Sequence, residues 1–140
     1  KETGLWDTYI RTDTQLITKK KLGANAKNLD YFDAVFFYTS GELDLDDEQK
    51  TALLEFVRTE GKGFMAAHSG VDTLYNWPEY GELVGGYFDL HPWNQFNARI
   101  VNEDAKHPAT AHFPAEVEVE NAHNGYRPSW RAIEAAIAFP

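Results

Sequence analysis

The glycine-bounded apolar run from Gly61 to Gly70 constrains the fold of this chain more than any other segment. It reads Gly-Lys-Gly-Phe-Met-Ala-Ala-His-Ser-Gly, and such a run is typical of a strand that stops at a sharp turn. In open α/β sheets, ligands bind outside the carboxyl ends of the strands, which places His68 where chemistry is usually located. Hydrolases and amidotransferases carry a serine or cysteine nucleophile at such an elbow, in the pattern small-x-Ser/Cys-x-Gly. Ala66 to Gly70 align with that pattern, and histidine stands at the nucleophile position.

The residues before this run predict a strand and a helix that lead into it. Asp33 to Thr39 is nearly continuous in apolar residues, as expected of a strand buried on both faces of a parallel sheet, and it ends in the turn Ser40-Gly41-Glu42. Asp46 and Gln49 have the spacing of a capping box at a helix start, and Gly61 is placed to stop that helix. Strand, helix and strand in this order predict a right-handed βαβ unit with parallel strands.

The rest of the chain predicts further short elements of an α/β domain. We expect a strand at 5–12, loop or helix at 13–30, a helix with proline in its first turn at 78–86, strands nearer a sheet edge at 97–102 and 116–120, and a terminal helix at 130–138.

Length and composition restrict the class of protein. The 140 residues, 43% of them hydrophobic, suit one domain, and the sequence has no run of about 18 apolar residues that would span a membrane. A net charge of -9 argues against nucleic acid as a partner. The absence of cysteine excludes disulfides, cysteine-ligated zinc and a thiol nucleophile. The compartment stays open, either cytoplasmic or exported after removal of a signal.

Several motifs in a fixed order resemble one family. They are Asp33-Ala34-Val35-Phe36-Phe37, Thr39-Ser40-Gly41-Glu42, Gly61-Lys62-Gly63-Phe64, His68-Ser69-Gly70-Val71-Asp72-Thr73, Trp77-Pro78-Glu79-Tyr80, Gly85-Gly86-Tyr87-Phe88, His91-Pro92-Trp93 and His107-Pro108-Ala109-Thr110. Together they resemble the trehalose-utilisation (ThuA-like) domain family over roughly residues 5 to 120.

The resemblance implies a flavodoxin-like, three-layer sandwich around a central, mainly parallel sheet, related to class I glutamine amidotransferases. It does not imply amidotransferase activity, because the family carries histidine at the nucleophile position, as His68 does here. By comparison with the family, residues 1–140 read as a single domain that is incomplete at both ends. The family's first strand and helix are absent, and Glu120 to Tyr126 departs from its acidic Asp-Glu-x-Tyr motif. A sheet without that strand exposes an edge, which a homo-oligomer or another assembly partner would cover.

Histidine and carboxylate residues near the elbow are the candidates for chemistry. We expect His68, Asp72 and Glu82 to be catalytic, since a histidine oriented by carboxylates transfers protons near neutral pH. His68 and His91 are the candidate ligands of a divalent metal such as zinc, although the histidine spacings match no compact zinc motif. No cofactor is otherwise indicated. A purely structural role for His91 is about equally compatible with the sequence.

Aromatic and polar residues around the elbow are candidates for substrate binding. Flat aromatic rings beside carboxylates suit sugar rings, so we expect Ser69, Trp77, His91 and Trp93 to contact the substrate. Packing of these aromatic residues against the sheet is the alternative, and it is at least as common. Ser69 as a covalent nucleophile is disfavoured, because adjacent residues on a turn point apart and His68 therefore makes a poor base for it.

These observations predict a protein of carbohydrate metabolism that acts on trehalose or a related keto-disaccharide. The expected chemistry is histidine-based acid/base or metal-assisted, of a sugar hydrolase or isomerase type. The alternative is a non-catalytic sugar-binding or structural assembly module on the same fold.

Overall fold

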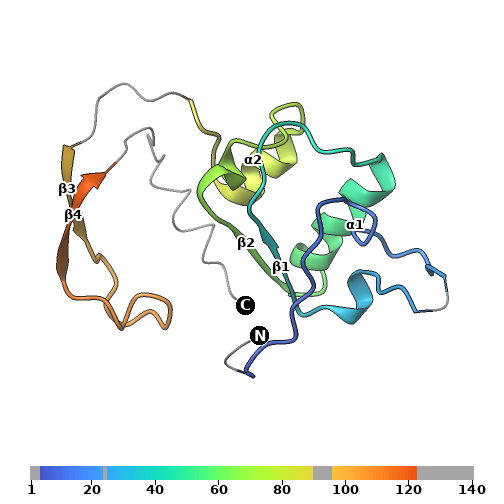
Figure 1. Ribbon diagram of the computed structural model, residues 1–140, viewed down its shortest axis with the longest axis horizontal. Helices are drawn as coiled ribbons and strands as arrows, with labels where there is room; N and C mark the ends of the chain where they lie inside the picture. The colour runs from blue at the N-terminus through green and yellow to red at the C-terminus, as the bar shows by residue number, and fades with distance from the viewer. Residues whose placement is uncertain (1–3, 24, 90–95, 123–140) are drawn as a thin grey trace.

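A computed structural model describes residues 4–23, 25–89 and 96–122 of the chain (Figure 1). Its elements are, in order, the 3-10 turn η1 (Leu29–Tyr31), β1 (Ala34–Phe37), α1 (Asp47–Arg58), β2 (Gly63–Ala66), the 3-10 turn η2 (His68–Val71), α2 (Pro78–Val84), β3 (Phe96–Val101) and β4 (Glu116–Ala122). The strand, helix and strand predicted around the elbow correspond to β1, α1 and β2.

Helix α1 begins and ends as its sequence predicts. The Asp46 carboxylate accepts from the Gln49 backbone N–H at 2.8 Å, and the Gln49 side chain accepts from the Asp46 N–H at 3.1 Å, which completes a capping box. At the other end, Gly61 takes a left-handed conformation with φ of 67°, so that the Lys62 N–H donates back to the Phe56 carbonyl. The regular helix itself ends slightly earlier, at Arg58.

The first sheet consists of β1 and β2, which pair in parallel from Ala34 opposite Gly63 to Phe37 opposite Ala66. The two strands present alternate residues to opposite faces. One face contributes Phe37 to the core, with Phe64 packed against it, and α1 adds Leu53 and Phe56, which are fully buried.

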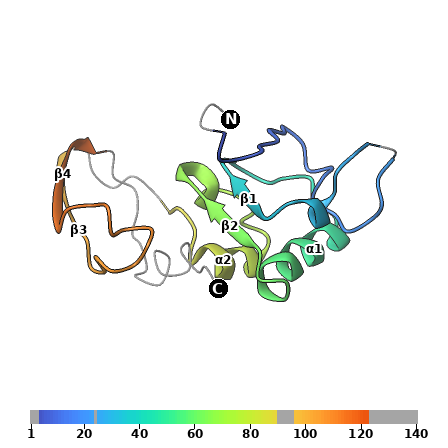
Figure 2. The same cartoon turned by 90° about the horizontal axis from the view of Figure 1, so that it is seen from below.

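Both helices cover the same face of this sheet (Figure 2). Phe36 and Met65 lie on the other face, where Phe36 is 58% exposed. Within the described residues the unit therefore has two layers, and the predicted three-layer sandwich is not confirmed. The fold class α/β with a parallel strand pair is confirmed.

Strands β3 and β4 form a second, antiparallel sheet of their own, with Val101 opposite Glu116 and Ala98 opposite Val119. The sequence predicted both strands but placed them nearer an edge of one common sheet. The two strands pair with each other instead, and the 14-residue connection between them (102–115) reverses the chain direction.

The strand expected at 5–12 is wrong. These residues form no strand, and Ile10 is 91% exposed. A strand requires the backbone of a neighbour, and no described strand pairs with this segment. Side chains of this segment make contacts instead: the Tyr9 ring meets Tyr31 and Phe32 edge to face at 5.6 and 5.4 Å, and Asp7 accepts from the Tyr31 hydroxyl.

Candidate active site at the carboxyl edge of the parallel strands

The turns that follow β1 and β2 are joined to each other by backbone hydrogen bonds. The Gly41 N–H donates to the Asp72 carbonyl at 2.7 Å, and the Leu74 N–H donates to the Gly41 carbonyl at 3.0 Å. Gly41 has φ of 75°, a left-handed conformation that glycine adopts without steric cost. Side chains from both turns are therefore held at one edge, as predicted for a site outside the carboxyl ends of parallel strands.

His68 lies at this edge as the first residue of η2, and its side chain is exposed. Its φ of 51° is left-handed, a conformation that is uncommon in residues other than glycine and is concentrated at functional sites. The imidazole lies 5.8 Å from the Tyr38 ring, measured between centroids, with the planes at 36°. The backbone thus presents the imidazole to solvent beside an aromatic residue from β1's turn.

Asp72 caps η2, and its carboxylate is bound from two sides. Ser40 donates from Oγ to Oδ2 at 2.8 Å, and the Tyr75 hydroxyl lies 2.7 Å from Oδ1. These hydrogen bonds, that of Tyr75 first, lower the pKa of Asp72 below its usual value. Asp72 is therefore a carboxylate at neutral pH, fitted to accept hydrogen bonds or orient a partner rather than to give up a proton.

Ser69 contributes to the turn through its backbone. Its carbonyl accepts from the Asp72 N–H at 2.8 Å and from the Thr73 hydroxyl at 3.0 Å, and Thr73 also bonds Thr39 at 3.0 Å between hydroxyl oxygens. These contacts fix the shape of η2 and connect it to the end of β1. A contact of the Ser69 side chain with substrate stays a prediction.

Glu82 does not join these residues. It is an exposed residue of α2, and its carboxylate pairs with Arg58 at 3.3 Å. Arg58 closes α1 just before the chain enters β2, which is the amino end of that strand, whereas His68 follows the carboxyl end. The sequence placed Glu82 near His68 only because the two are close along the chain.

Trp77 is a core residue. It is 6% exposed, and its ring stacks on Tyr80 with centroids 5.9 Å apart. The N-terminus of α2 turns this side chain inward, so that it packs among the residues beneath the sheet. Trp77 therefore packs against the sheet, which was the alternative to substrate binding, and its ring has no open face for a sugar ring.

His91 and Trp93 lie outside the described residues, so their predicted roles are untested. Within the described residues no group of three or more histidine, aspartate and glutamate side chains is arranged to hold a metal ion. His107, another histidine of the sequence, occupies a turn in which its Nδ1 accepts from the Ala109 N–H at 3.1 Å. A zinc ion held by His68 and His91 stays a prediction.

Ser40, Tyr38 and Tyr75 complete the polar edge, although none of them is among the catalytic, metal-binding or substrate-binding residues predicted above. A signal for Ser40 was present, because Ser40-Gly41 follows β1 just as Ser69-Gly70 follows β2. Two strands that end in the same Ser-Gly pair indicate equivalent turns at one edge. The pairing of Tyr75 with Asp72 had no comparable signal.

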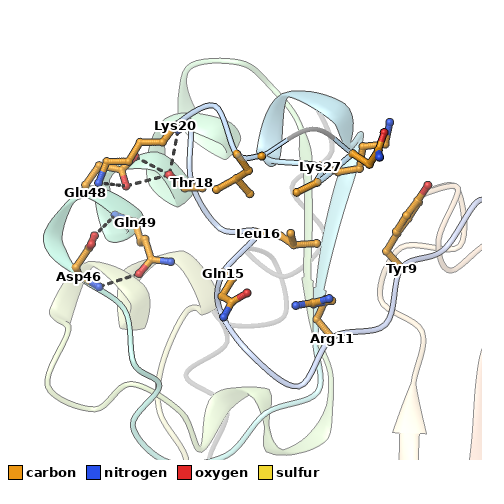
Figure 3. A pocket seen from close by; sticks show the side chains of 14 residues that line it. Tyr9, Arg11, Gln15, Leu16, Thr18, Lys20, Lys27, Asp46, Glu48 and Gln49 are labelled. Carbon is orange, nitrogen blue, oxygen red and sulfur yellow. Dashed lines mark hydrogen bonds and ion pairs between the residues drawn. The ribbon is translucent and has the colours of Figure 1, made fainter.

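A separate open cavity of about 760 Å³ lies between residues 9–27 and the start of α1 (Figure 3). Several of its polar side chains bond one another: Asp46 and Gln49 form the capping box, and Glu48 accepts from Thr18 and pairs with Lys20. None of the predicted site residues lines it. We therefore place the candidate site at the strand ends.

The fold and the site define an α/β protein with His68 and several polar side chains gathered at the carboxyl edge of a parallel strand pair. A family model described as trehalose utilisation (ThuA) matches residues 6–138, and the chain belongs to this family. The resemblance drawn from the sequence motifs is thereby confirmed.

Among solved structures, the chain is similar to a ThuA-like protein from Bacteroides uniformis, with 19% identity and a TM-score of 0.51. The match covers 66% of this chain and 38% of that protein, so this similarity supports the fold alone. No curated protein matches the chain. In the described part of the chain, every helix is too short or too polar to cross a membrane.

Proposed function

We propose that this chain acts on trehalose or a related keto-disaccharide at the carboxyl edge of β1 and β2, with His68 as general acid/base. The observation that carries the proposal is the arrangement of the two turns. His68 is exposed with a left-handed backbone, and Asp72, four residues on, is held as a carboxylate by Ser40 and Tyr75. The trehalose-utilisation family supplies the substrate class.

The chemistry assigned to the site divides between these two residues. An imidazole takes and gives protons near neutral pH, which suits the proton transfers of a sugar hydrolase or isomerase. The Asp72 carboxylate accepts hydrogen bonds from sugar hydroxyls and so positions the substrate. Amidotransfer is not proposed, because His68 occupies the nucleophile position and the chain has no cysteine.

Turnover of trehalose and of its keto derivative by the purified chain, followed by NMR of the sugar signals, tests the proposal. We expect His68→Gln to reduce turnover by about 100-fold or more, which is typical of the loss of a general acid or base. His112→Gln serves as the matched control, since His112 is also exposed and lies against Phe113 in a different turn. Unchanged turnover in His68→Gln would overturn the assignment.

One observation favours a second candidate function, a sugar-binding or assembly module without catalysis. Phe36 and Met65 are exposed on the face of the β1–β2 sheet opposite the helices. Parallel sheets are ordinarily covered on both faces, so a second copy of the chain is the partner we propose for this candidate. Sugar binding without turnover, together with a dimer mass in light scattering, would support it over the enzyme.

A further inference from the structure

Tyr75 is held more firmly than an exposed tyrosine ordinarily is. Its hydroxyl lies 2.7 Å from Asp72 Oδ1 and 2.9 Å from the Phe88 carbonyl oxygen, two acceptors for its single proton. Its ring stacks on Tyr87, with centroids 5.0 Å apart and planes at 24°. The ring is therefore fixed both at its polar end and across one of its faces.

The Tyr87 ring that supports it is itself anchored. Its hydroxyl lies 3.0 Å from the Leu74 carbonyl oxygen and accepts from the Gly81 N–H at 3.1 Å. A Cβ at Gly81 would lie 2.4 Å from the Tyr87 ring, so the packing beneath it is close. Tyr75 thus rests on a rigid support, and a ligand that stacks on it would not have to order a mobile side chain.

Tyr75 nevertheless remains 42% exposed. One ring face lies on Tyr87 and the hydroxyl faces Asp72, so the opposite face and edge of the ring are the parts that a ligand could reach. An open aromatic face of this kind is suited to the C–H face of a sugar ring, because the C–H groups are weakly positive and the aromatic face is negative.

The carboxylate at the end of this ring supplies the second half of a sugar site. Asp72 accepts one hydrogen bond at each oxygen, from Ser40 and Tyr75, and each carboxylate oxygen has a further lone pair. Asp72 is only partly buried, so the protein does not enclose this residue fully. A pyranose on the ring face would have its hydroxyl rim within reach of this acceptor.

We propose that the open face of Tyr75 is the sugar-stacking surface of the site and that Asp72 binds the hydroxyls of the stacked ring. This inference rests on the proposed function for its substrate class. It gives Tyr75 the role that the sequence assigned to Trp77, whose ring is buried. Because Asp72 caps η2, the stacked sugar lies against the turn that carries His68.

Binding of trehalose to the purified chain, measured by calorimetry and by saturation-transfer NMR, tests this role. Tyr75→Phe keeps the ring face and removes only the hydroxyl, and we expect affinity within about threefold of wild type. Tyr75→Leu keeps apolar bulk against Tyr87 but removes the flat face, and we expect affinity to fall by about tenfold, or 1.4 kcal/mol. Circular dichroism of each variant verifies that the fold is retained.

Tyr31→Leu is the matched control. Tyr31 is 45% exposed and also contacts aromatic rings, those of Tyr9 and Phe32, away from the strand ends. We expect it to bind trehalose as wild type does. Wild-type affinity in folded Tyr75→Leu would overturn the stacking role alone, while leaving the proposed function standing. If the wild-type chain bound neither trehalose nor its keto derivative, both proposals would fail together.

Discussion

Ser40 and Asp72 are 32 residues apart in the sequence, and a 2.8 Å hydrogen bond from Ser40 Oγ to Asp72 Oδ2 joins the turns at the ends of β1 and β2. The contact connects two loops that local sequence treats separately. With the backbone bonds of Gly41, it makes the carboxyl edge of the sheet one connected surface. Removal of the Asp72 charge should therefore affect both turns.

Asp72→Asn is expected to lower the melting temperature at pH 7, because an amide oxygen cannot replace both acceptors of the carboxylate. The hydrogen bonds from Tyr75 and Ser40 depress the pKa of Asp72 in the folded state. These hydrogen bonds therefore stabilise the fold above the pKa of Asp72 in the unfolded chain, about 3.9. Their contribution is lost as the pH falls through the lower pKa that Asp72 has in the folded protein. Thermal unfolding from pH 7 to pH 2.5 should show the melting temperatures of wild type and Asp72→Asn converging in the acid range.

Asp44→Asn is the control for this comparison, since Asp44 is exposed and its contact with Thr14 uses the backbone carbonyl and not the carboxylate. Its melting temperature should follow that of wild type across the whole pH range. If the melting temperatures of wild type and Asp72→Asn differed by a constant amount down to pH 2.5, the lowered pKa of Asp72 would be contradicted.

Asp46→Ala should destabilise the domain by about 1 kcal/mol, because it removes the side-chain acceptor that caps α1. The free energy of unfolding in urea, measured by helical circular dichroism, gives this value directly. Asp46→Asn preserves an acceptor oxygen at the cap, so it should lower the free energy of unfolding much less. Equal losses in the two variants would show that the charge at the helix terminus, rather than the cap bond, is the main contribution.

Gly70→Ala should destabilise the domain by about 1–3 kcal/mol through overpacking. The added Cβ would lie 2.9 Å from the Ala66 Cβ and 3.0 Å from the Phe37 carbonyl oxygen, both of them on the strands that Gly70 follows. Gly23→Ala is the matched control, because a Cβ there meets nothing within 4 Å and the backbone needs no positive φ. Similar urea midpoints for the two variants would argue against the close packing of η2 on the sheet.

The βαβ unit was predictable because its signals are local. The capping box at Asp46 and Gln49, the left-handed glycine after α1 and the apolar strand runs each depend on neighbours within a few residues. The expected strand at 5–12 failed for the opposite reason. Alternation of apolar and polar residues shows that a segment suits a sheet, but it does not supply a partner strand.

The places of the candidate site residues in the fold were only partly predictable. The elbow correctly placed His68 and Asp72 at the carboxyl edge, because an abrupt end to an apolar run fixes where the strand stops. Glu82 and Trp77 follow soon after in sequence, but the direction of a helical side chain depends on how α2 packs. That packing buries Trp77 and turns Glu82 toward Arg58, and neither orientation can be derived from spacing alone.

Comparison of His68→Gly with His68→Ala separates the backbone conformation of His68 from its chemistry. Both variants lack the imidazole and its contact with Tyr38, so both should lose turnover if His68 transfers the proton. At φ of 51°, however, alanine carries the steric cost of a left-handed conformation and glycine does not, so the glycine variant should be more stable by about 1 kcal/mol. At neighbouring Ala67, with φ of -116°, substitution by glycine should instead reduce stability by a similar amount. Urea unfolding of the three variants measures both changes in stability. If His68→Gly were less stable than His68→Ala, the left-handed conformation of this residue would be contradicted.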